Sequence, residues 1–170
     1  MLRLIVLSGL PGSGKSTVAK AIASELHLPI YSVDPMESAI IKAGFDRSFK
    51  TGLAAYLVAE TLADEQLSLG QTVIIDAANY VREAQEMWIK LANKHGAELK
   101  VIACICANET QHQERIAKRV RGFFGLPEIT WSDIEKRKVE NTPWQVEYLV
   151  LDTSRAFNAT MREALKYISA

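Results

Sequence analysis

The feature that most constrains this chain is the segment Gly9-Leu10-Pro11-Gly12-Ser13-Gly14-Lys15-Ser16, which matches the pattern G-x-x-x-x-G-K-[ST] in full. An apolar run over residues 2–7 precedes it and predicts a strand buried on both faces. After it, Val18, Ile22 and Leu26 recur at four-residue spacing, as on a helix that lies on a sheet. A phosphate-binding loop requires this strand before it and this helix after it. We therefore predict such a loop here.

The residues within the loop are suited to hold the phosphates of ATP. Gly12 and Gly14 let the backbone curl, so that successive N–H groups and the positive end of the helix point at one anion. Lys15 would reach the β- and γ-phosphates, and the Ser16 hydroxyl would ligate Mg²⁺ between them. The loop residues that we expect to contact ATP are Gly9, Gly12, Ser13, Gly14, Lys15, Ser16 and Thr17.

Length and charge limit the class of protein. A chain of 170 residues can bury one substantial core, and we expect residues 1–170 to form a single domain. Twenty Lys and Arg balance twenty Asp and Glu, so the molecule as a whole has no net attraction for nucleic acid or membranes. We find no signal peptide and no long apolar span, and we expect a cytoplasmic protein with no nucleic-acid or membrane partner.

Asp34 follows a short strand candidate over residues 29–33, and two roles are compatible with that position. It could cap the next helix, because Pro35 suits the first helical position and Glu37 completes a capping-box spacing. It could equally be a carboxylate at the carboxyl end of a strand, where open α/β sheets bind their ligands. We expect Asp34 to contact a substrate.

Two consecutive helices then interrupt the alternation of strands and helices. We predict helices over residues 36–44 and 51–69, joined by a loop that holds Arg47, and we place Leu53 and Leu57 on the apolar side of the second. In a phosphotransferase, an excursion of this kind over residues 36–69 would cover the acceptor of the phosphoryl group. Arg47 is therefore a candidate substrate contact.

Asp76 ends an apolar, β-branched strand predicted over residues 72–76. A charged residue at the end of a buried strand is a helix cap or a metal ligand, and we favour the ligand because a phosphate-binding loop needs an acid in the Mg²⁺ shell. Asn79 is expected to cap a helix over residues 81–95. Both side chains are also candidate contacts to the acceptor.

Three arginines accompany a charged helix that opens with a capping pattern at Asn108. One interpretation is a solvated helix face. The other is a movable lid over residues 113–127, because Arg115 and Arg119 are one helical turn apart and could together close over phosphates. We expect Arg115, Arg119 and Arg121 to bind ATP. A further capped helix is predicted to begin at Ser132, followed by a strand over 148–151 and a helix over 154–168.

Other reactive side chains point to no additional chemistry. Cys104 and Cys106 are two apart in an apolar strand and lack the second pair that a zinc site needs, so we expect both to be small, reduced core residues. The histidines His27, His95 and His112 are scattered, and we expect them to be solvated or at helix ends.

Strands and helices that alternate around such a loop predict an α/β protein with the P-loop nucleoside triphosphate hydrolase fold: a doubly wound, mainly parallel five-stranded sheet, helices on both faces and a small helical lid. Four features together resemble the small P-loop kinases, a group with polynucleotide kinases, zeta toxins, chloramphenicol phosphotransferase and gluconate kinases. They are the loop with Thr17, Asp34, the run Val-Ile-Ile-Asp-x-x-Asn-Tyr that contains Asp76, and the arginine-bearing helix before Leu-Asp-Thr-Ser. The resemblance extends over nearly the whole chain.

The resemblance implies roles for particular residues. It implies that Asp34 is the general base, that Asp76 lies near Mg²⁺ or the acceptor, and that the three arginines cover the nucleotide. It also implies that the Asp76 strand lies beside the loop strand. Polynucleotide kinases often carry Asp-x-x-Arg after the second strand, whereas Glu37 stands at the fourth position here, which argues against a strongly anionic acceptor at that place.

These observations predict an ATP-dependent, Mg²⁺-requiring kinase for a hydroxyl of a small molecule such as a sugar, an aminocyclitol or a nucleoside. Lys15 and Arg119 would stabilise charge on the transferred group, and Asp34 would accept the proton of the acceptor. A polynucleotide 5′-hydroxyl kinase is the alternative within the enzyme class. A nucleotide-gated binding module with little phosphotransfer is the alternative from another class.

Overall fold

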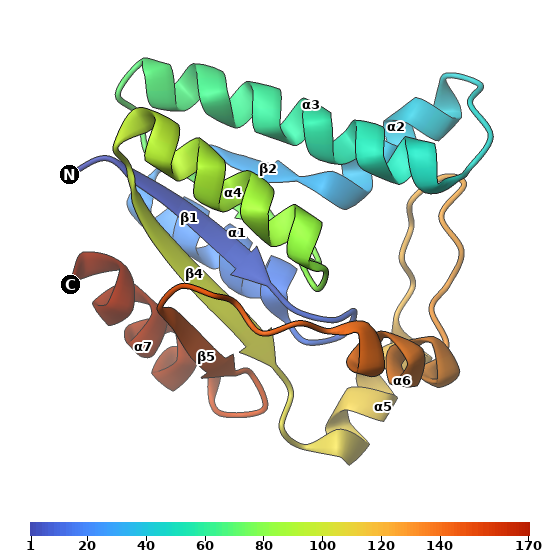
Figure 1. Ribbon diagram of the computed structural model, residues 1–170. Coiled ribbons are helices and arrows are strands. Elements are labelled where there is room, and N and C mark those ends of the chain that lie inside the picture. The colour runs from blue at the N-terminus through green and yellow to red at the C-terminus, as the bar shows by residue number, and fades with distance from the viewer.

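The computed structural model describes residues 1–170, with a five-stranded parallel sheet at its centre in the order β2-β3-β1-β4-β5 (Figure 1). The strands are β1 (Arg3–Ser8), β2 (Ile30–Ser32), β3 (Val73–Asp76), β4 (Glu98–Ile105) and β5 (Tyr148–Asp152). The helices are α1 (Lys15–Leu26), α2 (Val33–Lys42), α3 (Phe49–Ser68), α4 (Arg82–His95), α5 (Glu109–Lys118), α6 (Trp131–Glu140) and α7 (Phe157–Ser169).

The central strand β1 sets the frame for the functional residues. It pairs with β3 on one side and β4 on the other, with Leu7 opposite Asp76 in the register of β1 and β3. Strand β2 pairs with β3, with Ser32 opposite Asp76. The predicted α/β fold and the predicted neighbourhood of the Asp76 strand and the loop strand are confirmed. Three adjacent strands therefore end at the same edge of the sheet.

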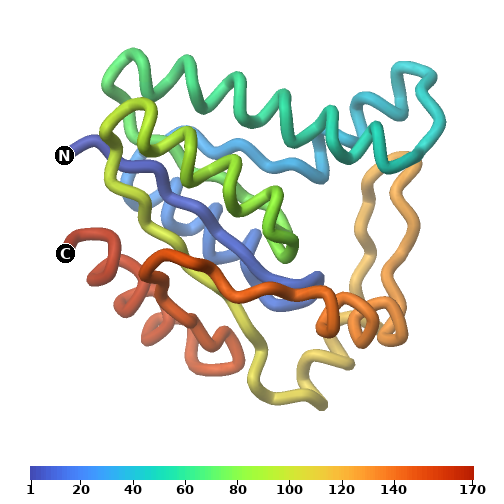
Figure 2. Tube along the Cα trace, viewed as in Figure 1, coloured from blue at the N-terminus to red at the C-terminus, as the bar shows by residue number.

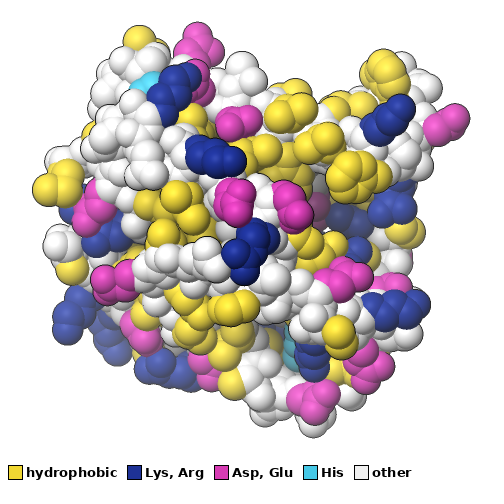
Figure 3. Space-filling view, in the orientation of Figure 1, with side chains coloured by type: hydrophobic (Ala, Val, Ile, Leu, Met, Phe, Trp, Pro, Cys, Tyr) yellow, Lys and Arg dark blue, Asp and Glu magenta, His cyan; other side chains and the backbone are white.

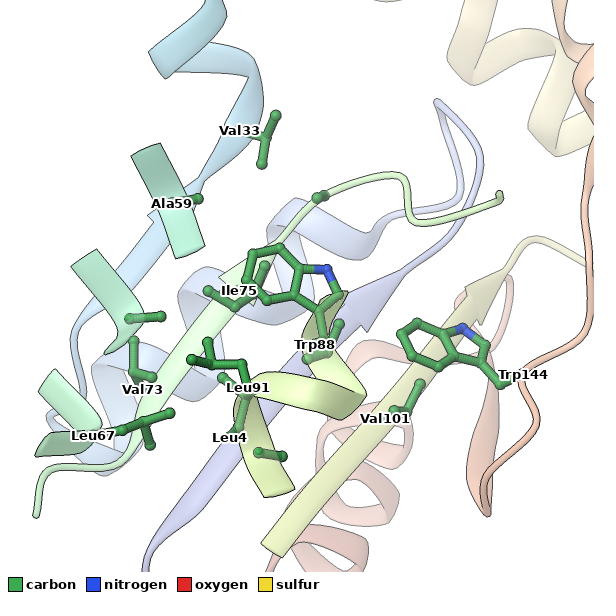
Figure 4. Close-up of a cluster of buried hydrophobic side chains, with 14 of the residues drawn as sticks. Leu4, Val33, Ala59, Leu67, Val73, Ile75, Trp88, Leu91, Val101 and Trp144 are labelled. Carbon is green, nitrogen blue, oxygen red and sulfur yellow. The ribbon is translucent and has the colours of Figure 1, made fainter. Parts of the chain in front are cut away.

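Helices cover both faces of the sheet, because β1 and β3 alternate apolar side chains between two buried clusters. Leu4 and Val73 face α3 and α4 together with Trp88, as Figure 4 shows. Ile5 and Ile74 face α1 and α7 on the opposite side. Figure 2 traces the same layers, with α3 and α4 on one side of the sheet and α1 on the other. Strands buried on both faces explain the continuous apolar runs in the sequence.

Helix α3 packs through small residues rather than through its leucines. The fully buried alanines Ala55, Ala59 and Ala63 recur every four residues, whereas Leu53 and Leu57 are 42% and 46% exposed. The expectation that these leucines face the core is wrong, because alanines at that spacing let α3 lie close to the sheet. Apolar side chains are visible along α3 on the face shown in Figure 3.

Several helix ends differ from the predictions in ways that affect the site. Helix α2 already begins at Val33 with Ser32 at its N-cap, so Asp34 lies in the first turn and is not a cap. Glu37 does not complete a capping box, since its Oε1 accepts a hydrogen bond of 3.2 Å from the Thr51 hydroxyl on α3. Asp34 therefore does not serve as a helix cap, and its carboxylate is not needed to begin α2.

The predicted lid helix is also shorter than expected. Helix α5 ends at Lys118, and Arg119 has extended backbone angles, so Arg115 and Arg119 do not lie on one helix. Residues 119–130 are irregular, and the next helix is capped by Thr130 with Asp133 rather than by Ser132 with Glu135. We call residues 119–130 the lid segment. Its irregular backbone carries the second and third arginines.

Candidate active site

The loop between β1 and α1 presents its backbone to a cleft. Gly14 is the N-cap of α1, has φ +85° and provides no side chain to cap the helix, so the first N–H groups of α1 lack an intrahelical partner. A Cβ at Gly14 would meet the Thr153 hydroxyl at 2.9 Å, and one at Gly9 would meet the Cys104 carbonyl oxygen at 2.4 Å. Only glycine fits these two positions. The loop is thus shaped to receive an anion on its backbone amides.

Lys15, Ser16 and Asp76 lie together at the ends of β1 and β3. Lys15 is only 9% exposed, yet its ammonium group has no ion-pair or hydrogen-bond partner within the protein. The Ser16 hydroxyl donates to Asp76 Oδ1 at 3.1 Å, and the Ser32 hydroxyl donates to Asp76 Oδ2 at the same distance. A hydroxyl and a carboxylate side by side are hard oxygen donors that suit Mg²⁺. The residues present therefore fit a Mg²⁺–phosphate group.

A cleft of about 570 Å³ opens beside the loop. It is lined by the loop residues Gly12, Gly14, Lys15, Ser16, Thr17 and Val18, by Gln111, Arg115, Lys118 and Arg119, and by Thr153, Arg155, Phe157 and Thr160. Among the predicted arginines, Arg115 and Arg119 reach this cleft. Gln111, Arg155 and Phe157 were not predicted, because the cleft forms only when β5 and α5 meet the loop. Thr153 stands in the run Leu-Asp-Thr-Ser, but no role was predicted for it. A nucleotide bound on the loop would lie against them.

Helix α5 is fastened to the loop rather than free. Arg115 donates to the Thr153 hydroxyl at 2.8 Å and to the Thr153 carbonyl at 2.7 Å, and the Thr153 hydroxyl donates to the Ser13 carbonyl at 2.7 Å. His112 is 6% exposed, lies 2.8 Å from the Pro11 carbonyl oxygen and packs edge-on against Trp131. Of the two alternatives expected for His112, solvated or at a helix end, the first is wrong, since His112 lies buried in the first turn of α5 and joins α5 to the loop.

Asp34 and Arg121 form an ion pair away from this cleft. Arg121 Nη2 lies 3.0 Å from Asp34 Oδ2, with the Asp34 side chain 37% exposed and the Arg121 side chain 9% exposed. Arg121 does not line the cleft beside the loop. The structure therefore differs from the expectation that Arg121 contacts ATP, because the lid segment carries it to the first turn of α2 instead.

Asn79 is enclosed by the protein, and its side-chain amide is hydrogen-bonded within it. It is 0% exposed, and its Nδ2 donates to the Leu7 carbonyl at 3.0 Å while its Oδ1 accepts from Trp88 Nε1 at 2.8 Å. The N-cap of α4 is Val81, so Asn79 does not cap that helix. The prediction that Asn79 caps α4 is wrong, whereas its contact with an acceptor stays a prediction, although β1 and α4 enclose its amide.

Tyr56 was not predicted and lies near both carboxylates. Its hydroxyl accepts a hydrogen bond of 3.2 Å from the Asn79 N–H. Burial raises the pKa of Tyr56 to about 12, the hydrogen bond from Asn79 opposes this, and the charges of Asp34 and Asp76 add to the increase. Tyr56 is therefore protonated at neutral pH, so its hydroxyl keeps a proton to donate and does not act as a base.

The remaining residues singled out in the sequence do not line the cleft beside the loop. Arg47 is exposed in the loop between α2 and α3 and has no side-chain partner within the protein. Cys104 is buried as expected, and burial raises the pKa of its thiol to about 12, while Cys106 is half-buried after the end of β4 and is not a core residue. None of the helices combines the length and hydropathy needed to span a membrane.

Comparisons with known proteins agree with this geometry. The family model described as an AAA domain matches residues 4–140. A UPF0200 protein of Aeropyrum pernix is 29% identical over 170 residues, covering 89% of this chain and 85% of that protein. A solved structure from Chloroflexus aurantiacus aligns with a TM-score of 0.80 at 22% identity, covering 98% of each chain. A gluconokinase from Sinorhizobium meliloti aligns with a TM-score of 0.72 at 19% identity, covering 98% of this chain and 91% of that one.

Proposed function

The chain belongs to the AAA domain family, and from this premise we propose that it is an ATP-dependent kinase that phosphorylates a hydroxyl group of a small molecule. One observation carries the proposal. The unpartnered Lys15 and the bonded pair Ser16–Asp76 stand at one end of the phosphate loop, and Asp34 follows the neighbouring strand β2. This arrangement supplies a donor site for a triphosphate and a carboxylate for an acceptor at the same sheet edge.

The donor half uses the chain's own positive groups. The N–H groups at the start of α1 and the Lys15 ammonium would bind the β- and γ-phosphate oxygens. Ser16 and Asp76 would hold Mg²⁺, which when bound neutralises charge on the phosphates. Arg119 lines the cleft without a side-chain partner in the protein, and it would offset the charge that spreads over the γ-phosphate oxygens.

The acceptor half rests on Asp34. The acceptor oxygen would form a bond to the γ-phosphorus while the bond to the β,γ-bridging oxygen breaks, so that ADP leaves. Asp34 would accept the hydroxyl proton, since it is 37% exposed and is not occupied as a helix cap. Helices α2 and α3 would cover the acceptor, within the excursion over residues 36–69. The lid segment would close over both substrates.

The test is a panel of hydroxyl compounds with ATP and Mg²⁺, scored for ADP and for a phosphorylated product by mass spectrometry. The panel should hold sugars, sugar acids, aminocyclitols, nucleosides and an oligonucleotide with a free 5′-hydroxyl. We expect ADP release to rise with one class of small molecule and product to appear in equal amount. A Lys15→Ala preparation controls for contaminating kinases. ATP binding without product from any compound, with stable ATP, would instead support the binding-module alternative.

A further inference from the structure

The ion pair between Arg121 and Asp34 is incomplete on the arginine side. Arg121 Nη2 lies 3.0 Å from Asp34 Oδ2, and Arg121 Nη1 donates a hydrogen bond of 3.3 Å to the Pro127 carbonyl oxygen. Its Nε is buried and has no hydrogen-bond partner at all. A buried donor without an acceptor is unfavourable and rare in folded proteins. An arginine that is 9% exposed with one free edge therefore calls for a ligand that the protein itself does not supply.

The position of Arg121 is fixed by the backbone of the lid segment. The two legs of this segment run from the α5–α6 end of the molecule to α2, as Figures 1 and 2 show. The Ser38 hydroxyl of α2 donates to the Phe124 carbonyl at 3.0 Å, and Gly125 lies so close to Ile41 that a Cβ there would be 2.4 Å away. The Arg121 N–H donates to Glu128 at 2.9 Å. Arg121 is thus placed beside Asp34 by three separate contacts.

The charges around this place are of both signs, and the feature that favours an anionic ligand is the unpartnered Nε of Arg121. Asp34, Glu37 and Asp76 are three carboxylates on or beside the acceptor side, and Arg121 is the arginine in contact with one of them. Figure 3 shows a recess between α3 and the lid segment with both acidic and basic atoms inside it. A guanidinium binds best to two oxygens held in one plane, which a single Asp34 oxygen does not provide.

We propose that Arg121 binds an anionic substituent of the acceptor, a carboxylate or a phosphate, next to the hydroxyl that Asp34 deprotonates. The proposal rests on the kinase function proposed above and adds the chemical class of its substrate: a hydroxy acid or a hydroxylated phosphate ester. Nε and Nη2 would face two oxygens of the anion. Asp34 would lose its partner at the same moment, so its carboxylate would become free to accept the hydroxyl proton only when an anionic acceptor is bound.

The first experiment follows the Arg121 Nε–H signal by NMR, with the phosphate loop saturated by MgADP. That signal is assigned as the one absent from Arg121→Gln. The probes are D-glycerate and D-gluconate for carboxylates, glycerol 3-phosphate for phosphate esters, and the neutral polyols glycerol and sorbitol. We expect a saturable shift with at least one anion and none with the polyols. No saturable shift with any of the three anions, or equal shifts with the polyols, would overturn the proposal.

The second experiment compares Arg121→Gln with Arg162→Gln, a matched change at an exposed arginine on α7. Backbone amide shifts report anion affinity, and thermal unfolding confirms that both variants fold. We expect Arg121→Gln to lower the affinity for the anion by roughly tenfold or more, the usual contribution of a charge-assisted hydrogen bond. Arg121→Lys should recover part of the loss, and Arg162→Gln should bind normally. Equal affinity in Arg121→Gln would refute the site.

ADP release separates this proposal from the kinase proposal. If the anion binds at Arg121 but ATP is never consumed, the site stands and the kinase function fails. If a neutral polyol is phosphorylated and Arg121→Gln leaves its KM and kcat unchanged, the kinase function stands and the role of Arg121 fails.

Discussion

The proposed donor side and the proposed acceptor side of the site are built in opposite ways. The donor side is one contiguous loop whose groups are mainly backbone amides, backed by Lys15 and held by Arg115 and Thr153. The acceptor side is assembled from side chains on α2, α3 and the lid segment, joined by single contacts such as Asp34–Arg121. Backbone amides recognise any phosphate chain, whereas separate side chains can select one small molecule. The difference places generality on the loop and specificity on the segments around it.

The largest effect that tests this division should come from Asp34→Asn. A general base contributes about 10² to 10⁴ in rate, so phosphorylation of the acceptor should fall by that factor. ADP affinity should hardly change, because Asp34 does not line the nucleotide cleft. Steady-state rates and ADP titrations measure the two sides separately.

Asp34→Ala is a useful second variant, since Asp34 is not the N-cap of α2 and its removal should not cost the helix its cap. Both variants should fold, with only a small loss from the acidic first turn. Phosphorylation at nearly the original rate in both would assign the proton to another group, with Asp76 as the next candidate.

Lys15→Ala should have the next largest effect, confined to the donor side. The ammonium group has no partner in the protein, so its loss should leave the fold intact. A charge-assisted contact to phosphate contributes about 1.5–3 kcal/mol, which corresponds to a loss of roughly 10- to 150-fold in nucleotide affinity. Calorimetry with MgADP and MgATP measures it. Unchanged nucleotide affinity and turnover would contradict the assignment of the loop.

Thr153→Val should produce a smaller effect on the same side. The hydroxyl donates to Ser13 and accepts from Arg115, so its loss loosens the contact between the loop and α5. Two ordinary hydrogen bonds are worth about 0.5–1.5 kcal/mol each, and we expect ADP affinity to fall by roughly 3- to 10-fold. Anion binding at Arg121 should not change. A parallel loss at Arg121 would show that the two sides are not independent.

The smallest effect concerns how the stability of the fold depends on pH through Asp152, which precedes Thr153 at the end of β5. Burial alone would raise the pKa of Asp152, but hydrogen bonds from the Ala107 and Ser154 N–H groups hold it below its ordinary value. A carboxyl with a lowered pKa in the folded state stabilises the fold above the unfolded pKa, about 3.9, and that contribution disappears as the pH falls through the folded pKa. Asp152→Asn should therefore be less stable than the natural chain at pH 7.

Urea unfolding at pH 7 and pH 3.5 measures this difference. The free energies of unfolding of the two proteins should approach each other at the lower pH. A difference that is constant with pH would show that Asp152 acts through its shape and not through its charge.

The donor side could be predicted from the sequence, and most of the acceptor side could not. The loop residues and Asp76 lie within short segments whose strands and helices are strongly patterned, so their positions follow from local structure. The pair of Asp34 and Arg121 depends on how an irregular segment crosses α2, which no local pattern encodes. The sequence pattern predicted Asn79 as a helix cap. Its burial depends on contacts with Leu7 and Trp88, which form only in the folded protein, so no local pattern could indicate it. The buried face of α3 could likewise not be predicted from its alanines, because their close packing exists only once the helix lies on the sheet.

The enclosed Asn79 also decides which parts of the molecule can move relative to each other. Its left-handed backbone, with φ +52°, and its amide join the end of β1, helix α4 and, through its N–H, the hydroxyl of Tyr56 on α3. The end of β1, which leads into the phosphate loop, is thereby tied to both α4 and α3. We expect these contacts to set the distance between the two proposed substrates, with the lid segment as the part that adjusts. Substitutions that fit the site to a larger or smaller acceptor would then occur in α2, α3 and the lid segment, while the sheet stays unchanged.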